Sequence, residues 1–412
     1  MKVRSRENDE IFISQNQDME MDHVARFLRG KTVLITGATG FLAKVFVEKI
    51  LRLQPNVKKL YLLLRASDDK SATQRLHDEI TSTELFRVLR DNWSWRFDNL
   101  ISSKVIAVAG DISFENLGIA DSKLREKMWS EIEILVNVAG TTDFNERAKL
   151  NGWPNTYVFT KAMGEMLLGK FKGDLPLVII RPTMITSTFK QPFPGWIEGV
   201  RTVDRIVVNY GKGKLSFFLG DFNSTLDVIP VDMVVNAMVV AMEVHYADRQ
   251  CSRETIYHIS SSSRNPMKVS DFRKFMRCYF TENPWVDTNG NVVKVGEATL
   301  FTAPGRFFLY MHLKYVLPLK VFCLINILCC QRFKKTYTNL DRKIKYILRL
   351  AEFYRPYTFF TGIFDDRNLE KLQRVAEDRG IDVTEFNFDS KSIDWEDYIM
   401  NIHIPGLFQH EK

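Results

Sequence analysis

The chain has 412 residues, 45% of them apolar and 12% aromatic, which is enough to bury a large core in two domains or in one enlarged domain with an appendage. Lys and Arg number 57 against 50 Asp and Glu, and the net charge of +7 favours anionic partners such as phosphates or acidic lipid head groups. The sequence has no long basic run and no recognition-helix signature, so we expect no nucleic acid partner.

The cysteines and the N-terminal residues indicate a reducing compartment. The five cysteines show neither metal-ligand spacing nor a disulfide framework, so we expect no metal site. The first thirty residues are charged where a signal peptide is apolar, and acidic where a transit peptide avoids acid. We therefore expect a protein that is neither secreted nor imported into a plastid.

Five continuous apolar runs predict strands that are buried on both faces. The runs begin at Lys31, Lys58, Lys104, Ile132 and Leu175. Amphipathic stretches long enough for crossover helices lie between most of them. This alternation predicts an α/β fold built on a Rossmann-type doubly wound parallel sheet. After about residue 265 the sequence becomes helical, basic and aromatic, which predicts a second domain.

The segment "TGATGFLAKVFVEKIL" directly follows the first predicted strand and opens a helix. Gly37 allows a tight turn, and Gly40 lets the backbone approach a pyrophosphate. The helix N-terminus adds free N–H groups and the positive end of a dipole, and Ala43 is an acceptable third small residue. This pattern predicts a dinucleotide cofactor. The alternative is a glycine-rich turn used only for packing.

The ends of the next two strands bear on which dinucleotide binds. Arg65 stands where an NAD site carries an acidic residue for the ribose, and an arginine there suits the 2′-phosphate of NADP(H). Asp68 and Asp69 follow closely and weigh against this interpretation. After the third strand, Asp111 and Ile112 are placed to touch the adenine, unless they form an ordinary strand-end turn.

Tyr157 and Lys161 lie one helical turn apart in "NTYVFTKAMGEML" and suit carbonyl reduction. A tyrosine hydroxyl has a pKa near 10, and a nearby ammonium is expected to lower the pKa of the Tyr157 phenol. Tyr157 would give a proton to the carbonyl oxygen, while Lys161 reaches the nicotinamide ribose. Ala139, in the turn that leaves the fourth strand, is assigned to the same cofactor site. The alternative for the pair is a solvated helix face.

Several segments together resemble the plant-type alcohol-forming fatty acyl-CoA reductases of the extended short-chain dehydrogenase/reductase superfamily. They are "KTVLITGATGFLAKVFVEKILRLQPNVKKLYLLLRA", "NTYVFTKAMGEMLL", "VIIRPTMITSTFKQPFPGWIEG" and "YRPYTFFTGIFDD". The similarity extends from about residue 20 to the end of the chain. It implies an NADPH-dependent conversion of a long-chain acyl-CoA, through an aldehyde, to a primary alcohol. It also implies the endoplasmic reticulum, and we expect peripheral attachment at the cytoplasmic face of its membrane.

The resemblance also assigns residues and domains. By matching position, the cofactor loop is Gly37, Thr39, Gly40, Phe41 and Leu42, the catalytic pair is Tyr157 with Lys161, and Arg181, Pro182 and Thr183 lie beside the nicotinamide. We divide the chain into an N-terminal extension over 1–24, an NADP-binding reductase domain over 25–265, and a mainly helical fatty acyl-CoA reductase domain over 266–412.

The chain departs from the family after "VNVAGTTDFNERAKL". The family pattern continues there with a helix and a strand ending in a "STAY"-like segment, whereas this chain passes directly to "NGWPNTYVFTK". A βαβ unit needs about thirty residues, so the interval from Ala139 to Tyr157 is too short, and one helix and one parallel strand are missing. Thr141 or Thr142 is a weak candidate to replace the lost serine hydroxyl.

Two structural outcomes follow from the missing segment. In one, the helix of Tyr157 keeps its usual place, which leaves a gap in the sheet and exposes apolar strand edges. In the other, the strand from Leu175 moves over by one position, which closes the sheet and displaces Tyr157. The functional alternatives are an active reductase and a catalytically impaired NADP-binding relative that acts as a homo- or hetero-oligomeric partner of intact homologues.

Two later segments have open interpretations. "PFPGWIEGV", from Pro192, suits an apolar pocket for an acyl chain, or ordinary loop packing. The stretch from Phe307 to Cys330 contains a clean apolar run of only Val321 to Cys330, so we do not expect it to span a membrane. With the basic residues after it, it suits either a helix lying on an anionic membrane or a buried core helix followed by a solvated one.

Overall fold

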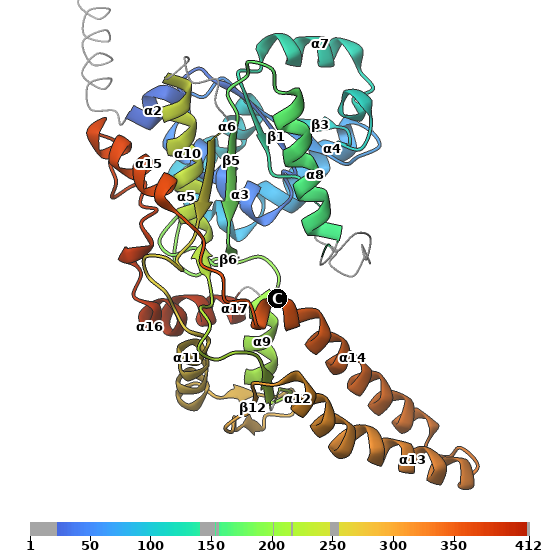
Figure 1. The fold of residues 1–412 in the computed structure, drawn as a ribbon. Helices are drawn as coiled ribbons and strands as arrows, with labels where there is room; N and C mark the ends of the chain where they lie inside the picture. Colours follow the sequence, from blue (N-terminus) through green and yellow to red (C-terminus); the bar gives the residue numbers. More distant parts are fainter. Residues whose placement is uncertain are drawn as a thin grey trace, which may run out of the picture.

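A four-stranded parallel sheet with the order β3-β2-β1-β4 lies at the centre of the N-terminal part of the chain (Figure 1). The computed structural model describes residues 23–140, 153, 156–200, 202–215, 217–247 and 255–409. The predicted strands are confirmed as β1 (Thr32–Thr36), β2 (Lys59–Leu64), β3 (Val105–Ala109), β4 (Ile134–Asn137) and β5 (Val178–Pro182). The helices before and between β1 and β4 are α2 (His23–Leu28), α3 (Phe41–Leu53), α4 (Asp69–Leu76), α5 (Arg87–Trp93), α6 (Phe97–Lys104) and α7 (Ser122–Glu131).

Both faces of this sheet are covered, as the continuous apolar runs predict. Alternate residues of a strand point to opposite faces. On β1, Val33 and Ile35 join the large core beside α3, whereas Leu34 joins a smaller core with Met128 of α7. The doubly wound arrangement predicted from the sequence is therefore confirmed for these four strands.

The sheet is interrupted after β4. Within the described residues, β4 pairs only with β1, and β5 pairs instead with β9 (Thr255–Ile259) in a separate parallel pair. The structure therefore has the first of the two predicted outcomes, a gap in the sheet. The second predicted outcome, in which β5 moves into the vacant strand position, is wrong.

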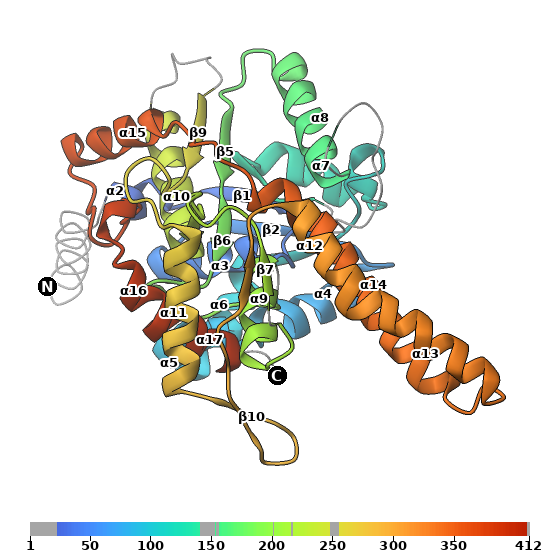
Figure 2. The ribbon, with the colours of Figure 1, turned by 60° about the horizontal axis from the view of Figure 1, so that its bottom comes forward.

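Apolar side chains are exposed along this gap. Leu135 of β4 is 56% exposed. The helix that carries Tyr157, α8 (Thr156–Phe171), has no buried residue, and Phe171 at its end is 72% exposed. Both views place α8 near α7 (Figures 1 and 2). The predicted exposed apolar edge is thus present on β4, and the apolar side chains of α8 are exposed as well.

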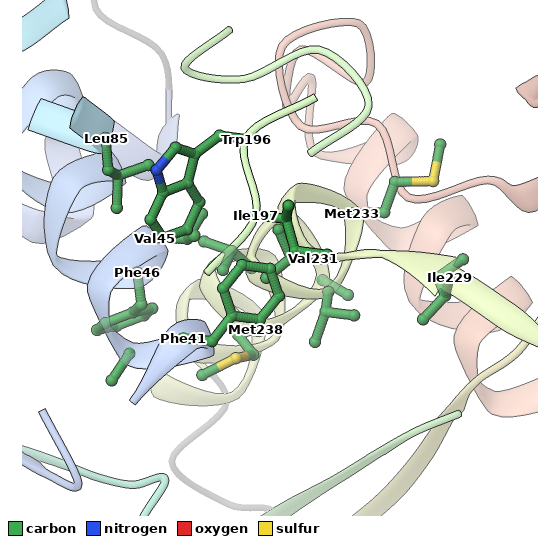
Figure 3. Close-up of a cluster of buried hydrophobic side chains, with 14 of the residues drawn as sticks. Phe41, Val45, Phe46, Leu85, Trp196, Ile197, Ile229, Val231, Met233 and Met238 are labelled. Atoms are coloured by element: carbon green, nitrogen blue, oxygen red, sulfur yellow. The ribbon is translucent and has the colours of Figure 1, made fainter. Parts of the chain in front are cut away.

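The loop after β6 (Met184–Thr186) packs into the core instead of lining a pocket. Trp196 stacks on Phe41 at the start of α3, with ring centroids 5.3 Å apart. Figure 3 shows Trp196 and Ile197 among the side chains of α3 and of α10 (Val231–Ala247). For these two residues the loop-packing interpretation of "PFPGWIEGV" is confirmed and the pocket interpretation is wrong.

The rest of the chain is mainly helical and packs partly on the N-terminal core. Its last helices return to that core: α15 (Arg367–Asp378) lies against α10 and β9, and the buried Tyr398 donates a hydrogen bond to the Ser187 carbonyl at 2.8 Å. The remaining elements are β7 (Phe217–Leu219), β8 (Val228–Pro230), β10 (Trp285–Val286), β11 (Val292–Val293), β12 (Thr299–Phe301), α9 (Thr202–Gly211), α11 (Val269–Glu282), α12 (Pro304–Met311), α13 (Leu317–Leu328), α14 (Lys334–Thr358), α15 (Arg367–Asp378), α16 (Trp395–Asp397) and α17 (Ile404–Gln409).

A helical hairpin leaves the body of the protein. α12, a π-helical turn (His312–Val316) and α13 form one continuous helix, and α14 runs back beside it (Figures 1 and 2). The helix from Pro304 to Leu328 is long and apolar enough to cross a membrane by length and composition, and only 6% of its most apolar 18-residue window is buried. The buried-core interpretation is therefore wrong for this helix, and the expectation that the segment does not span a membrane stays a prediction.

Candidate active site

The turn between β1 and α3 is held against the end of β4. Gly37 has a positive φ of +70°, and a Cβ added there would lie 2.7 Å from the backbone nitrogen and Cα of Ala139. Gly40 donates its N–H to the Gly37 carbonyl at 2.9 Å and precedes the first turn of α3. Gly37 is thus required by the shape of the turn, and the 13-residue helix that follows Gly40 presents its free N–H groups, which fits a pyrophosphate.

Asn137 fixes this junction, although the sequence analysis did not single it out. Its side-chain oxygen accepts a hydrogen bond from the Thr36 hydroxyl at 2.6 Å and one from the Ala139 N–H at 3.3 Å. The amide therefore ties the end of β1 to the turn after β4. Its position at the end of a predicted inner strand was the feature of the sequence that could have identified this role.

Phe41 is only 8% exposed, and its ring packs on Trp196. A cofactor can therefore meet the backbone of Phe41 and not its ring. Thr39 and Leu42 are half-buried in the same turn and first helical turn. All five predicted loop residues lie together at the start of α3.

The second group of predicted cofactor residues lies at the ends of β2 and β3. The exposed Arg65 side chain reaches Asp111, with Nε 3.3 Å from Oδ2. Hydrogen bonds from Ser113 and then the charge of Arg65 hold the pKa of the Asp111 carboxyl below its usual value. Asp68 accepts the Ser71 N–H at 2.7 Å as the N-cap of α4. Ile112 is exposed beside Asp111.

Lys161 points to the same turn from α8. Its ammonium donates to the Ala139 carbonyl at 2.7 Å and lies against Gly140, where an added Cβ would be 2.9 Å from Nζ. Burial lowers the pKa of Lys161, partly offset by the charge of Glu165. Because Ala139 also packs on Gly37, the structure brings the predicted lysine to the predicted glycine turn.

Tyr157 lies one turn earlier on α8, and its electrostatics differ from the prediction. Burial, followed by the phenol of Tyr357 near the end of α14, raises the pKa of Tyr157. The expected lowering by Lys161 is wrong, because the ammonium is directed at the Ala139 carbonyl. A phenol with a raised pKa remains protonated at neutral pH, which is the form that donates a proton. Thr141 and Thr142 lie outside the described residues.

Arg181 joins β5 to α8. Its guanidinium donates to the Glu165 carboxylate, with Nε 3.1 Å from Oε2, and Glu165 is one turn beyond Lys161. Pro182 is in register with Ile259 of β9, and Thr183 donates its N–H to the Ile259 carbonyl at 3.0 Å. Arg181 is therefore an anchor for the helix, and Glu165 is its partner, which the sequence analysis missed.

The fold and this site define a nicotinamide dinucleotide-dependent reductase of the Rossmann type. The NAD-binding model of the male sterility protein family matches residues 35–150 and 145–238, and a second model of that family matches residues 314–410. The reductase domain of a non-ribosomal peptide synthetase from Mycobacterium tuberculosis shares the fold, with a TM-score of 0.59 and 17% identity over 95% of each chain.

Two curated plant relatives are much closer in sequence. The alcohol-forming fatty acyl-CoA reductase of Simmondsia chinensis is 42% identical over 95% of this chain and 99% of its own length. Fatty acyl-CoA reductase 1 of Arabidopsis thaliana is 43% identical over 93% of this chain and 98% of its own length. This chain belongs to the plant-type alcohol-forming fatty acyl-CoA reductases.

The comparisons also support the missing segment. The alignment with the Simmondsia relative has 489 positions, but 95% of this chain is about 391 residues, so about 98 positions of that relative have no counterpart here. The NAD-binding family model matches in two pieces that meet at residues 145–150. The break falls between β4 and α8, where the sheet of this protein is interrupted.

Proposed function

We propose that this protein reduces long-chain fatty acyl-CoA to a primary fatty alcohol, through an aldehyde, with NADPH. The observation that carries the proposal is the contact of Lys161 with Ala139, which brings the Tyr157 helix to the glycine turn although the sheet beside it is incomplete. The family and the plant relatives named above support the substrate class.

The protein residues have separate tasks in this reaction. The dinucleotide, when bound, supplies a hydride to the carbonyl carbon. Tyr157 donates a proton to the carbonyl oxygen, where negative charge develops. Lys161 holds the ribose side of the cofactor from the Ala139 turn. The first reduction releases coenzyme A and leaves an aldehyde, and the second gives the alcohol.

NADPH is proposed over NADH because of the charges at the end of β2. Arg65 is exposed and available to a 2′-phosphate. Asp68, one of the two residues that weighed against this choice, is held at the N-terminus of α4 by hydrogen bonds from Ser71, and Asp69, the other, lies in the first turn of that helix. The nearest acidic group is Asp111, which is positioned to orient the arginine.

Replacing Arg65 by glutamine is expected to weaken NADPH binding and leave NADH binding unchanged. A charge-assisted hydrogen bond contributes about 1.5–3 kcal/mol, so the Kd of NADPH rises at least about tenfold. Fluorescence titration of both nucleotides measures this difference. Arg96→Gln, at another exposed arginine, is the matched control. An equal loss for NADPH and NADH in Arg65→Gln would contradict the assignment.

The reaction itself is tested with purified protein, NADPH and acyl-CoAs of graded chain length. We expect primary alcohol as the product, with two NADPH consumed for each alcohol formed. The gap in the sheet favours one competing function, a catalytically impaired partner of intact homologues. That function predicts nucleotide binding without turnover at every chain length, and an increase in activity when an intact relative is added.

The hydrophobic product favours a location at a membrane. We propose peripheral attachment at the cytoplasmic face of the endoplasmic reticulum. Fractionation of cells that express the full chain, with markers for each membrane, tests this location. Recovery of the protein entirely in the soluble fraction would exclude it.

A further inference from the structure

The hairpin of α13 and α14 is built to project from the protein. Its root is buried, because Phe307 and Met311 pack against Phe217 of β7. At its far end, Asn326 fixes the connecting turn by accepting the Phe333 N–H at 2.8 Å. Both views show the two helices side by side and extending away from the sheet domain (Figures 1 and 2). The hairpin is thus an ordered arm with a buried base.

One side of this arm is an exposed apolar stripe. Residues three or four positions apart lie on the same face of a helix. Six large apolar residues of the continuous helix follow this spacing and are at least 46% exposed, and Leu328 at the far end reaches 83%. We call them the hairpin stripe: Leu309, Leu313, Leu317, Val321, Leu324 and Leu328. Exposed apolar area of this extent marks an interaction surface.

The hairpin that carries the stripe is strongly basic. The sequence from Pro304 to Leu340 contains no acidic residue. α14 carries seven basic and two acidic residues, and its basic side chains Lys334, Lys335, Arg342 and Lys343 are exposed. An apolar stripe flanked by basic groups is the pattern of a helix that lies in the interface of an anionic membrane. A second copy of the chain fits less well, because it would bring two basic arms together.

The charges of α14 also decide between lying on a membrane and crossing it. α14 runs beside α13, so a crossing by the apolar helix would take Arg342, Lys343 and Lys345 into the bilayer. Placing Lys or Arg at the centre of a bilayer is strongly unfavourable. A flat orientation instead leaves the ammonium groups among the lipid phosphates and immerses only the stripe.

We propose that the α13–α14 hairpin docks flat on an anionic lipid surface, with the hairpin stripe immersed at the acyl boundary and the basic side chains of α14 at the phosphates. This docking specifies the peripheral attachment proposed above, and it does not depend on the proposed reaction. It gives the arm a partner of defined chemistry and brings the Tyr357 end of α14, which lies near Tyr157, close to the source of lipid substrates.

Sedimentation of the full chain with vesicles tests this proposal. We expect binding to phosphatidylcholine vesicles that contain phosphatidylserine, weak binding to phosphatidylcholine alone, and release by salt or alkaline carbonate. Lys334→Gln combined with Lys335→Gln lowers the partition coefficient on anionic vesicles about thirtyfold, since each basic residue near such a surface contributes about 1 kcal/mol. Leu324→Glu combined with Leu328→Glu lowers it on both kinds of vesicle.

Trp95→Glu is the matched control, because Trp95 is 80% exposed and lies outside the hairpin. It should bind vesicles like the unmodified chain. Nucleotide titration shows that each variant is folded, so a loss of vesicle binding is separated from unfolding and from a loss of activity. The proposal is overturned if the unmodified chain does not bind anionic vesicles, if Trp95→Glu loses as much binding as the leucine pair, or if carbonate leaves the protein in the membrane.

Discussion

Tyr157→Phe is expected to lower alcohol formation by about two to four orders of magnitude while NADPH still binds, since positioned general acids contribute about that much to rate. The phenol is partly buried, its pKa is raised, and it lies one helical turn from the lysine that reaches the glycine turn. Phenylalanine keeps the ring and removes only the proton donor. The rate is measured as alcohol released, and binding by fluorescence titration of NADPH.

Two matched comparisons test whether this effect is specific to the site. Tyr346→Phe, at an exposed tyrosine of α14, should leave the rate unchanged. Lys161→Met should lower both the rate and the affinity for NADPH, because Lys161 contacts the Ala139 turn, whereas Lys170→Met at the exposed end of the same helix should change neither. Alcohol formation by Tyr157→Phe at more than about a tenth of the normal rate would exclude the general-acid role.

The parts of the fold that were predicted correctly depend on short segments of sequence. Five apolar runs gave five strands because a strand buried on both faces needs no polar alternation. The turn from Gly37 to Gly40 was predictable because its shape is dictated within four consecutive residues. The missing helix and strand were predictable from chain length alone, since nineteen residues from Ala139 to Tyr157 cannot form a further βαβ unit.

The parts that were not predicted depend on contacts between distant segments. The sequence left both outcomes of the deletion open, because the position of β5 is decided by its pairing with β9 about eighty residues later. The pKa of Tyr157 depends on Tyr357, two hundred residues away and on another helix. Trp196 reads equally well as pocket lining or as core until its stacking on Phe41 is known.

The position of α8 is the weakest point of the candidate site. The strand that would lie between β4 and β5 is absent from the described sheet, and the apolar face of α8 is exposed. Among the contacts of the helix, Lys161 donates to the Ala139 carbonyl and Glu165 pairs with the exposed Arg181. Exposed ion pairs stabilise by about 1 kcal/mol or less. The ion pair of Glu165 with Arg181 therefore adds little to the stability of α8.

Gly37→Ala is expected to destabilise that turn and to lower kcat/KM about a hundredfold, because a displacement of about 1 Å in the site has an effect of this size. Two effects add. An alanine at φ +70° costs about 1–2 kcal/mol, and its Cβ would overlap the Ala139 backbone at 2.7 Å, which costs about 1–3 kcal/mol more. The turn must open, and Ala139 and Lys161 move with it. Urea unfolding measures the loss of stability, the rate of alcohol formation gives kcat/KM, and nucleotide titration gives the affinity for NADPH.

Gly30→Ala separates the two effects. Gly30 has nearly the same backbone angle, φ +72°, but no atom lies within 4 Å of the position that its Cβ would occupy. Gly30→Ala should therefore lower the free energy of unfolding by about 1–2 kcal/mol, from backbone strain alone, and should bind NADPH normally. If both alanine variants lose the same stability and both keep their affinity for NADPH, the contact between Gly37 and Ala139 does not shape the cofactor site. A loss of affinity confined to Gly37→Ala shows that the turn after β4 and the turn after β1 form one surface. Lys161 contacts that surface through Ala139, so this result would explain how α8 reaches the cofactor although β4 and β5 are not paired in the described sheet.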